Sequence, residues 1–135
     1  MNVRNPLYAF AFFLTILSSS AFSEMTGLEL YKQCQAVIDQ LSGKELTSEQ
    51  GFQVIFITGY VAGFVDFHSI QQMNCTDCKW DYCFPSNGVS NDEIIKAIYS
   101  YIEEKPKAVE LSARMLILAA LMNKYPCKKK SDNSK

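Results

Sequence analysis

Apolar residues recur at intervals of three and four positions along most of the chain, which predicts helices. Several of these stretches begin with a Ser or Thr and a Glu or Gln three residues later, the spacing of a capping box. No stretch alternates apolar and polar residues as a surface strand does. The predicted helices cover residues 26–42, 47–72, 90–105 and 106–124. We therefore expect an all-α fold, a compact bundle of about four helices.

The second of these helices is expected to lie at the centre of the bundle. One of its faces carries apolar residues and glycines at helical spacing: Phe52, Ile55, Phe56, Gly59, Gly63 and Phe67. Its other faces are also largely apolar, which is typical of a buried helix. A glycine costs a helix about 1 kcal/mol relative to alanine, and close packing of another backbone would compensate. Gly59 and Gly63 are therefore predicted helix-packing positions in the core, with contact between two copies as the alternative.

The same Gly-x-x-x-Gly spacing occurs where helices pack inside membranes, so a membrane span is an alternative for this helix. The uninterrupted apolar run extends only over residues 54–65, whereas a span needs about 20 apolar residues. Gln53, Asp66 and His68 close the run at its two ends. We predict no membrane span in the mature chain.

Residues 1–23 resemble a secretory signal peptide. Arg4 supplies the positive charge, residues 7–17 the apolar segment, and Ala21-Phe22-Ser23 a small-x-small cleavage site. An uncleaved anchor helix is the alternative, but the apolar run is short for a span. Cleavage would leave one domain over residues 24–127 followed by a short tail.

The charge of the mature chain is unevenly distributed. Residues 24–127 carry more acidic than basic side chains, whereas residues 128–135 hold four lysines and one aspartate. The tail has no apolar residues, so we expect a disordered basic tail. Nucleic-acid binding requires a basic face, which the acidic domain lacks, so nucleic acid is not an expected partner.

All five cysteines lie after the signal segment, at Cys34, Cys75, Cys78, Cys83 and Cys127. Export to an oxidising compartment makes disulfides the default interpretation, and the odd number leaves one thiol over or paired with another chain. Several pairings are compatible with the sequence. The prediction that ties the two ends of the domain together is Cys34–Cys127, with Cys83 bonded to Cys75 or Cys78.

Residues 74–89, between the second and third predicted helices, interrupt the helical pattern. This connection holds three of the cysteines, Trp80, and the turn pair Asn87-Gly88. Connections of this length inside a compact domain are usually functional or disordered. Three cysteines and two large aromatic side chains argue against disorder, so we expect a long, cysteine-rich functional connection.

The chain shows no catalytic or metal-binding signature. Cys75-x2-Cys78-x4-Cys83 with His68 nearby has some features of a zinc site, but the second pair is missing and export favours oxidation. A redox-active Cys-x2-Cys normally begins a helix in a βαβ unit, which is absent here. Asp66 and His68 are two residues apart, so their side chains point to different faces of a helix, and we expect a structural or rim role for both. No enzyme activity, metal or cofactor is predicted.

Short motifs follow one another in a fixed order through the mature chain. They are Leu30-x3-Cys34, Gly59-Tyr60-Val61-x-Gly63-x2-Asp66, Cys83-x-Pro85-x2-Gly88-Val89-Ser90, Tyr101-Ile102 with Pro106, and Ala119-x-Leu121 before Tyr125-Pro126-Cys127. In order and spacing, behind a signal peptide, they resemble the Rap/Tai-type immunity proteins of bacterial type VI secretion. The chain departs from that pattern at Ile57, where the family often has a cysteine.

The resemblance implies a small helical periplasmic protein, usually a homodimer, that binds a cognate peptidoglycan amidase effector and occludes its active-site cleft. The cysteine-rich connection is then the expected binding element. Its anchor candidates are Trp80 and Tyr82, and its polar contacts are Asp77, Lys79 and Asp81. The alternative for Trp80 is that it packs inward. A stress or chaperone-type periplasmic protein, or a thiol-redox protein using this connection, are the alternative functions.

Overall fold

The computed structural model describes residues 24–74 and 81–127. Their helices are α2 (Gly27–Leu41), α3 (Ser48–Asn74), α4 (Asn91–Glu104), the short 3-10 helix η2 (Pro106–Glu110) and α5 (Ala113–Lys124). The described part of the chain contains no strand and one isolated β-bridge, between Thr26 and Ser112. The predicted all-α class with four α-helices is confirmed.

Capping boxes begin three of the helices, as the sequence predicts. At the start of α2, the Glu29 N–H donates to the Thr26 hydroxyl (3.2 Å), while the Thr26 N–H donates to the Glu29 carboxylate (2.8 Å). Ser90 and Glu93 make the same pair of bonds before α4. Hydrogen bonds from the capping backbone lower the pKa of Glu29 and of Glu93. These local contacts set where each helix starts, because they satisfy amide groups that have no partner inside the helix.

The fourth predicted helix is divided. Pro106 begins the short η2 helix, and α5 starts only at Ala113. Between them Leu111 is extended, with φ −75° and ψ 159°. Its carbonyl accepts from the Gly27 N–H (2.9 Å), and the Ala113 N–H donates to the Met25 carbonyl (2.9 Å). Pairing with the residues before α2 therefore replaces helical hydrogen bonds, a tertiary effect that periodicity does not reveal.

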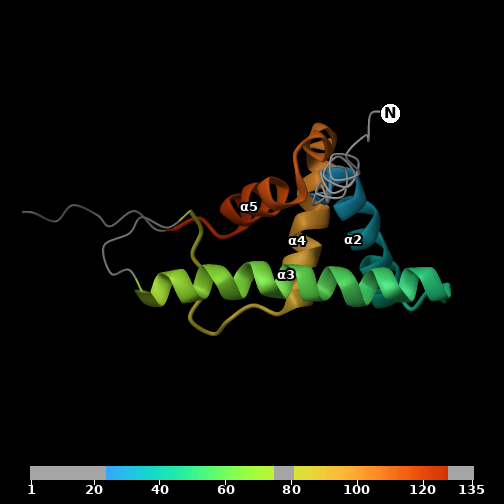
Figure 1. Cartoon of the computed structure of the whole chain (residues 1–135), viewed down its shortest axis with the longest axis horizontal. Coiled ribbons are helices and arrows are strands. Elements are labelled where there is room, and N and C mark those ends of the chain that lie inside the picture. Colours follow the sequence, from blue (N-terminus) through green and yellow to red (C-terminus); the bar gives the residue numbers. More distant parts are fainter. Residues whose placement is uncertain (1–23, 75–80, 128–135) are drawn as a thin grey trace, which may run out of the picture.

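The hydrophobic core lies among α2, α4, α5 and the inner side of α3. Figure 1 shows α3 running the full width of the described molecule, with α2 and α5 gathered along one side of it and α4 passing between them. α2 contacts α3, α4, η2 and α5, and α4 contacts α2, α3, η2 and α5, so these two helices lie at the centre of the described domain. The largest fully buried side chains are Tyr82, Leu30, Ile57, Ile94, Ile95, Ile98, Leu116, Ile117, Leu121, Val37, Val61 and Cys34.

The central, mostly buried position predicted for α3 is wrong. Only Ile57 and Val61 are buried in this helix. The face that was expected to point inward points to solvent, and its Phe52 side chain is 73% exposed. Gly59 and Gly63 are exposed, and a Cβ atom built on either would meet no atom within 4 Å. A core-packing role for the two glycines is therefore corrected, because no residue in 24–74 or 81–127 packs against them.

In the described residues, α3 is the one helix that is long and apolar enough to cross a membrane by length and composition. Core helices of soluble proteins can have the same length and apolar composition. Ile57 and Val61 are 0% exposed and belong to the common core, so α3 is packed into the helical domain.

Gly27 is a tight point of this architecture. Its N–H bonds to Leu111, and a Cβ atom at this position would lie 2.6 Å from the Leu111 carbonyl oxygen and 2.7 Å from that of Val109. Both neighbours are backbone atoms, which cannot move aside without shifting η2. Gly51 in α3 has no such neighbour, since nothing lies within 4 Å of a Cβ atom there.

We expect Gly27→Ala to destabilise the fold by about 1–3 kcal/mol, because the added methyl group overpacks the junction. Gly51→Ala is the matched control and should be neutral or stabilising by up to about 1 kcal/mol, since alanine favours the helix. Urea unfolding followed by circular dichroism measures both. Equal stability of the two variants would contradict the tight junction.

Candidate functional site

Residues 81–90, which lead from the cysteine-rich connection into α4, are tied to the C-terminal end of the domain. Cys83 forms a disulfide with Cys127, with 4.8 Å between the two Cα atoms. The Cys83 N–H also donates to the Tyr125 carbonyl at 2.8 Å. In Figure 1 this segment, in yellow, runs across α3 to meet the chain that leaves α5. The connection is therefore held at its exit by one covalent bond and one backbone hydrogen bond.

The predicted cysteine pairings are wrong. Cys34 is a free thiol, 0% exposed within the core, and is not bonded to Cys127. Burial raises its pKa to about 12, so the thiol stays neutral and unreactive at ordinary pH. Since Cys83 is bonded to Cys127, it is not bonded to Cys75 or Cys78, which themselves lie outside the described residues.

Tyr82 is the internal anchor of the segment. Its side chain is 0% exposed and stacks on the His68 ring of α3, with 3.9 Å between ring centroids. The Tyr82 ring meets Phe84 edge-on at 5.1 Å, and Phe84 meets Tyr125 in the same way at 5.1 Å. A row of aromatic rings thus joins α3 to Tyr125, which lies two residues before the disulfide at Cys127. His68 has a structural role in this row.

Of the five predicted binding residues, one is buried, one is exposed, and three lie outside the described residues. Tyr82 is buried, so its assignment as an exposed aromatic anchor for a partner is corrected. Asp81, the residue before it, is exposed. The remaining candidates, Asp77, Lys79 and Trp80, lie outside the described residues. Asp66, on α3, is also exposed, in agreement with a rim position.

The Tyr82 hydroxyl is a buried polar atom with no hydrogen-bond partner in the described part of the protein. Burial, with a smaller contribution from the Asp81 charge, raises the pKa of Tyr82 to about 12. A buried hydroxyl without a partner costs about 1–3 kcal/mol. The hydroxyl therefore adds nothing to the anchoring, which comes from the stacked ring.

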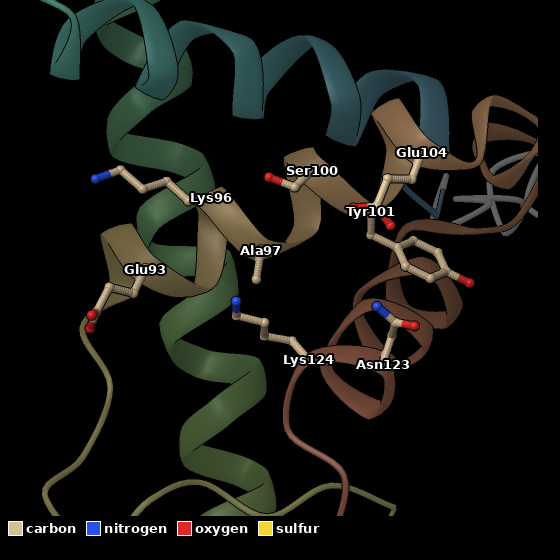
Figure 2. A pocket seen from close by; sticks show the side chains of 8 residues that line it. All are labelled: Glu93, Lys96, Ala97, Ser100, Tyr101, Glu104, Asn123 and Lys124. Atoms are coloured by element: carbon tan, nitrogen blue, oxygen red, sulfur yellow. The ribbon is translucent and has the colours of Figure 1, made fainter.

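A solvent-open hollow of about 240 Å³ lies between α4 and α5. Figure 2 shows its lining: Glu93, Lys96, Ala97, Ser100, Tyr101, Glu104, Asn123 and Lys124. Charges of both signs surround it, and Glu93 is already engaged in the cap of α4. Neither a nucleophile beside a base nor a pair of facing carboxylates is found there, so the hollow has no recognisable catalytic arrangement.

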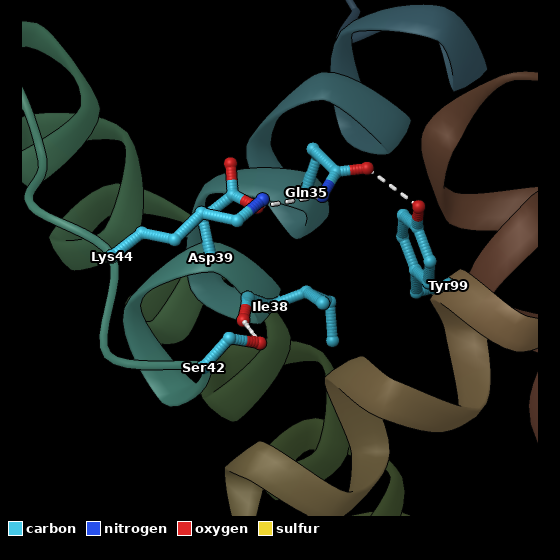
Figure 3. Close-up of polar contacts among 6 residues, drawn as sticks. All are labelled: Gln35, Ile38, Asp39, Ser42, Lys44 and Tyr99. Carbon is cyan, nitrogen blue, oxygen red and sulfur yellow. Dashed lines mark hydrogen bonds and ion pairs between the residues drawn. The ribbon is translucent and has the colours of Figure 1, made fainter.

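The polar cluster at the end of α2 is structural. Lys44 bonds to Asp39 at 2.6 Å, Gln35 donates to the same carboxylate at 3.0 Å, and the Tyr99 hydroxyl donates to Gln35 at 2.5 Å (Figure 3). The hydrogen bond from Lys44 holds the pKa of Asp39 below its usual value. Ser42 ends the helix by donating to the Ile38 carbonyl. The cluster joins α2 to α4 and to the loop before α3, and each member has its partner within the fold.

Residues 24–74 and 81–127 contain no group of three or more His, Cys, Asp or Glu side chains that could hold a metal ion. A family model of the Rap1a immunity proteins matches residues 26–127. The chain belongs to the Rap1a immunity protein family. It is thus an immunity protein of type VI secretion, and the family resemblance seen in the short motifs is confirmed. No curated protein and no solved structure matches the chain.

Non-reducing peptide mapping of the protein should find Cys83 linked to Cys127 and Cys34 as a free thiol. In the chain-entropy description, closing a loop with a sequence separation of 44 stabilises the fold by about 4 kcal/mol. Cys83→Ala with Cys127→Ala should lose about that amount in urea unfolding. A peptide joining Cys34 to any other cysteine would contradict the arrangement.

Tyr82→Phe should keep or raise stability by up to about 1–3 kcal/mol, because it removes the hydroxyl that has no partner. Tyr82→Ala should lose about 3–5 kcal/mol, because it removes the stacked ring and leaves a cavity. Chemical unfolding of the two variants beside the wild type distinguishes ring from hydroxyl. A large loss in the Phe variant would mean that the hydroxyl is bonded.

Proposed function

We propose that this Rap1a-family protein neutralises a peptidoglycan amidase effector of type VI secretion by binding it and occluding its active-site cleft. The observation that carries the proposal is the family match over residues 26–127. The resemblance of the short motifs to Rap/Tai-type immunity proteins implies the amidase as the target. An inhibitor of this kind needs a rigid shape and displayed side chains. It needs no converging titratable groups, and the described polar clusters serve helix caps and contacts between helices.

The proposed place of action is the periplasm, and the protein is not an enzyme in this proposal. Residues 1–23 have the composition of a cleavable signal peptide. The Cys83–Cys127 disulfide agrees with an oxidising compartment, where such bonds form and persist. A peptidoglycan amidase acts on the cell wall, so its inhibitor would meet it on the same side of the inner membrane.

The proposed binding element is the cysteine-rich connection, with Asp77, Lys79, Trp80 and Asp81 as its contact residues. Asp81 is exposed directly beside Tyr82, which the His68 stack and the neighbouring disulfide hold in place. A segment held in place before contact loses less conformational entropy on binding, which raises affinity. The burial of Tyr82 leaves Trp80 as the aromatic contact of this proposal.

The homodimer implied by the resemblance is also part of the proposal. The large apolar side chains on the solvent side of α3 are left exposed by the rest of the described domain. Burying them against a second copy would remove them from water, a favourable change of about 25 cal/mol per Å² of apolar surface.

We expect Trp80→Ala with Asp81→Ala to abolish binding to the cognate peptidoglycan amidase while leaving the melting temperature nearly unchanged. The matched control is Glu45→Ala, which removes an exposed charge from the loop at the opposite end of α3 and should bind at full strength. Calorimetric titration and an amidase assay on purified peptidoglycan measure the two effects.

Two results would count against this proposal in different ways. A double variant that still binds at full strength would move the binding surface away from the connection. A wild-type protein that neither binds the amidase nor inhibits it would remove the amidase as the target.

A further inference from the structure

One side of α3 is an uncovered apolar surface, here called the outer face. Six large side chains on it are more than half exposed: Phe52 73%, Ile55 72%, Phe56 56%, Phe67 63%, Ile70 51% and Met73 77%. Gly59 and Gly63 lie among them and are also exposed. Monomeric soluble proteins rarely leave so many large apolar groups together in water.

The outer face is a single continuous strip. At about 100° of rotation per residue, its members fall within about 60° on either side of a line through the two glycines. Val61, which is 0% exposed, lies on the opposite side of the helix, toward the core. Asp66 is the only charged residue of the strip between Phe52 and Met73. The strip is therefore separate from the inner side that holds α3 in the domain.

The area of the outer face suits a stable association. An aromatic side chain buries about 150–250 Å², so the exposed parts of the three phenylalanines amount to roughly 400 Å². The three aliphatic side chains are exposed to a similar degree. Together the six approach the roughly 800 Å² per partner of a standard protein interface.

Six of the eight residues on the outer face form pairs that are symmetric about one position. Phe52 and Ile70, Ile55 and Phe67, and Gly59 and Gly63 are three pairs, each centred on position 61. Position 61 is also the midpoint of α3, which covers Ser48–Asn74. A two-fold axis brings residue i of one copy to residue j of the other and residue j to residue i. Such a strip complements an antiparallel copy of itself.

We propose that α3 of one copy docks in an antiparallel manner on α3 of a second copy, with Gly59 of each opposite Gly63 of the other. In this arrangement an aromatic ring meets an aliphatic side chain at both outer pairs. Helix axes usually pack 8–10 Å apart, and the spacing depends on the side chains at the contact. Glycines at the crossing allow the closest approach, because no Cβ atom separates the backbones.

The surroundings of α3 are compatible with this pairing. α2 and α4 contact α3 on its inner side, and the helices gather along one side of it in Figure 1. The two Asp66 carboxylates start about 15 Å apart along the antiparallel axis, since each is five residues from the centre and a helix rises about 1.5 Å per residue. At that distance repulsion between exposed charges is largely screened by salt.

A lipid bilayer is the other possible cover for an apolar helix face. Helices that lie on membranes typically carry Lys or Arg on the polar side, which attract anionic lipids. Residues 48–74 contain no Lys or Arg and include Glu49 and Asp66. Two-fold symmetry of the strip also has no use at a lipid surface. Both observations favour a second copy.

The first experiment replaces one glycine of the outer face. Gly59→Leu should weaken dimerisation of the mature, oxidised chain by roughly tenfold or more in analytical ultracentrifugation, because a side chain separates the two backbones. It should leave the melting temperature of the monomer intact, since nothing lies within 4 Å of that Cβ position. Gly51→Leu is the matched control: it adds the same side chain to the same helix, away from the outer face, and should dimerise like the wild type.

The second experiment tests the antiparallel direction. Ile55→Lys and Phe67→Glu should each give a monomer, and the double variant should dimerise again, because the antiparallel pairing places the new charges opposite each other. In one chain the two positions are about 18 Å apart along the helix, so they cannot rescue each other within a copy. A parallel pair would place like charges together and give no rescue.

The inference deepens the homodimer of the proposed function and is independent of the toxin. A wild type that stays monomeric at 100 µM would overturn the homodimer itself. A dimer that persists unchanged in Gly59→Leu would keep the homodimer and overturn this interface. Sedimentation of a monomeric wild type with vesicles of phosphatidylethanolamine and phosphatidylglycerol would replace the second copy with a bilayer. Amidase binding is measured separately, so its loss or retention does not affect these results.

Discussion

The disulfide between Cys83 and Cys127 is the constraint on which the positions of residues 81–90 and of the C-terminal part of α3 depend. α3 has only two buried residues, Ile57 and Val61, and both lie near its middle. The C-terminal part of α3 is held by the stack of His68 on Tyr82. Tyr82 is kept in that position because its neighbour Cys83 is bonded to Cys127 at the end of the domain. One disulfide thus fixes both the end of a long helix and the exit of the proposed binding segment.

Local signals in the sequence predicted the helices well, and tertiary contacts decided what they did not predict. The capping boxes at Thr26, Thr47 and Ser90 form as expected, because they involve residues only three apart. The break at Leu111 arises from pairing with residues more than 80 positions earlier, which no local pattern contains. The prediction of which side of α3 is buried is wrong for a different reason. This helix carries apolar residues on all of its sides, so the periodicity of apolar residues does not distinguish the buried side from the exposed one.

The pairing of the cysteines in the candidate site also depends on tertiary contacts that no local sequence pattern contains. Cys34 shares the apolar stripe of Leu30 and Val37, and that position was a signal for a core thiol. Cys83 and Cys127 each lie close to an aromatic residue, Phe84 and Tyr125, whose rings pack together. Such a contact is visible only after folding. Among the candidate binding residues, the sequence could not distinguish the buried Tyr82 from the exposed Asp81.

The feature that made α3 difficult to orient from the sequence also explains its composition. A helix shared between a core and a second copy must be largely apolar on two opposite sides. Two glycines that cost the isolated helix about 1 kcal/mol each would then be offset by contacts formed only between copies. Because a Cβ atom at either glycine meets no other atom of the described domain within 4 Å, packing inside that domain gives no reason for their presence. The two glycines destabilise the isolated helix, and they would favour close packing of two helices in a symmetric pair. Both effects are consistent with an interface on the outer face of α3, away from the core.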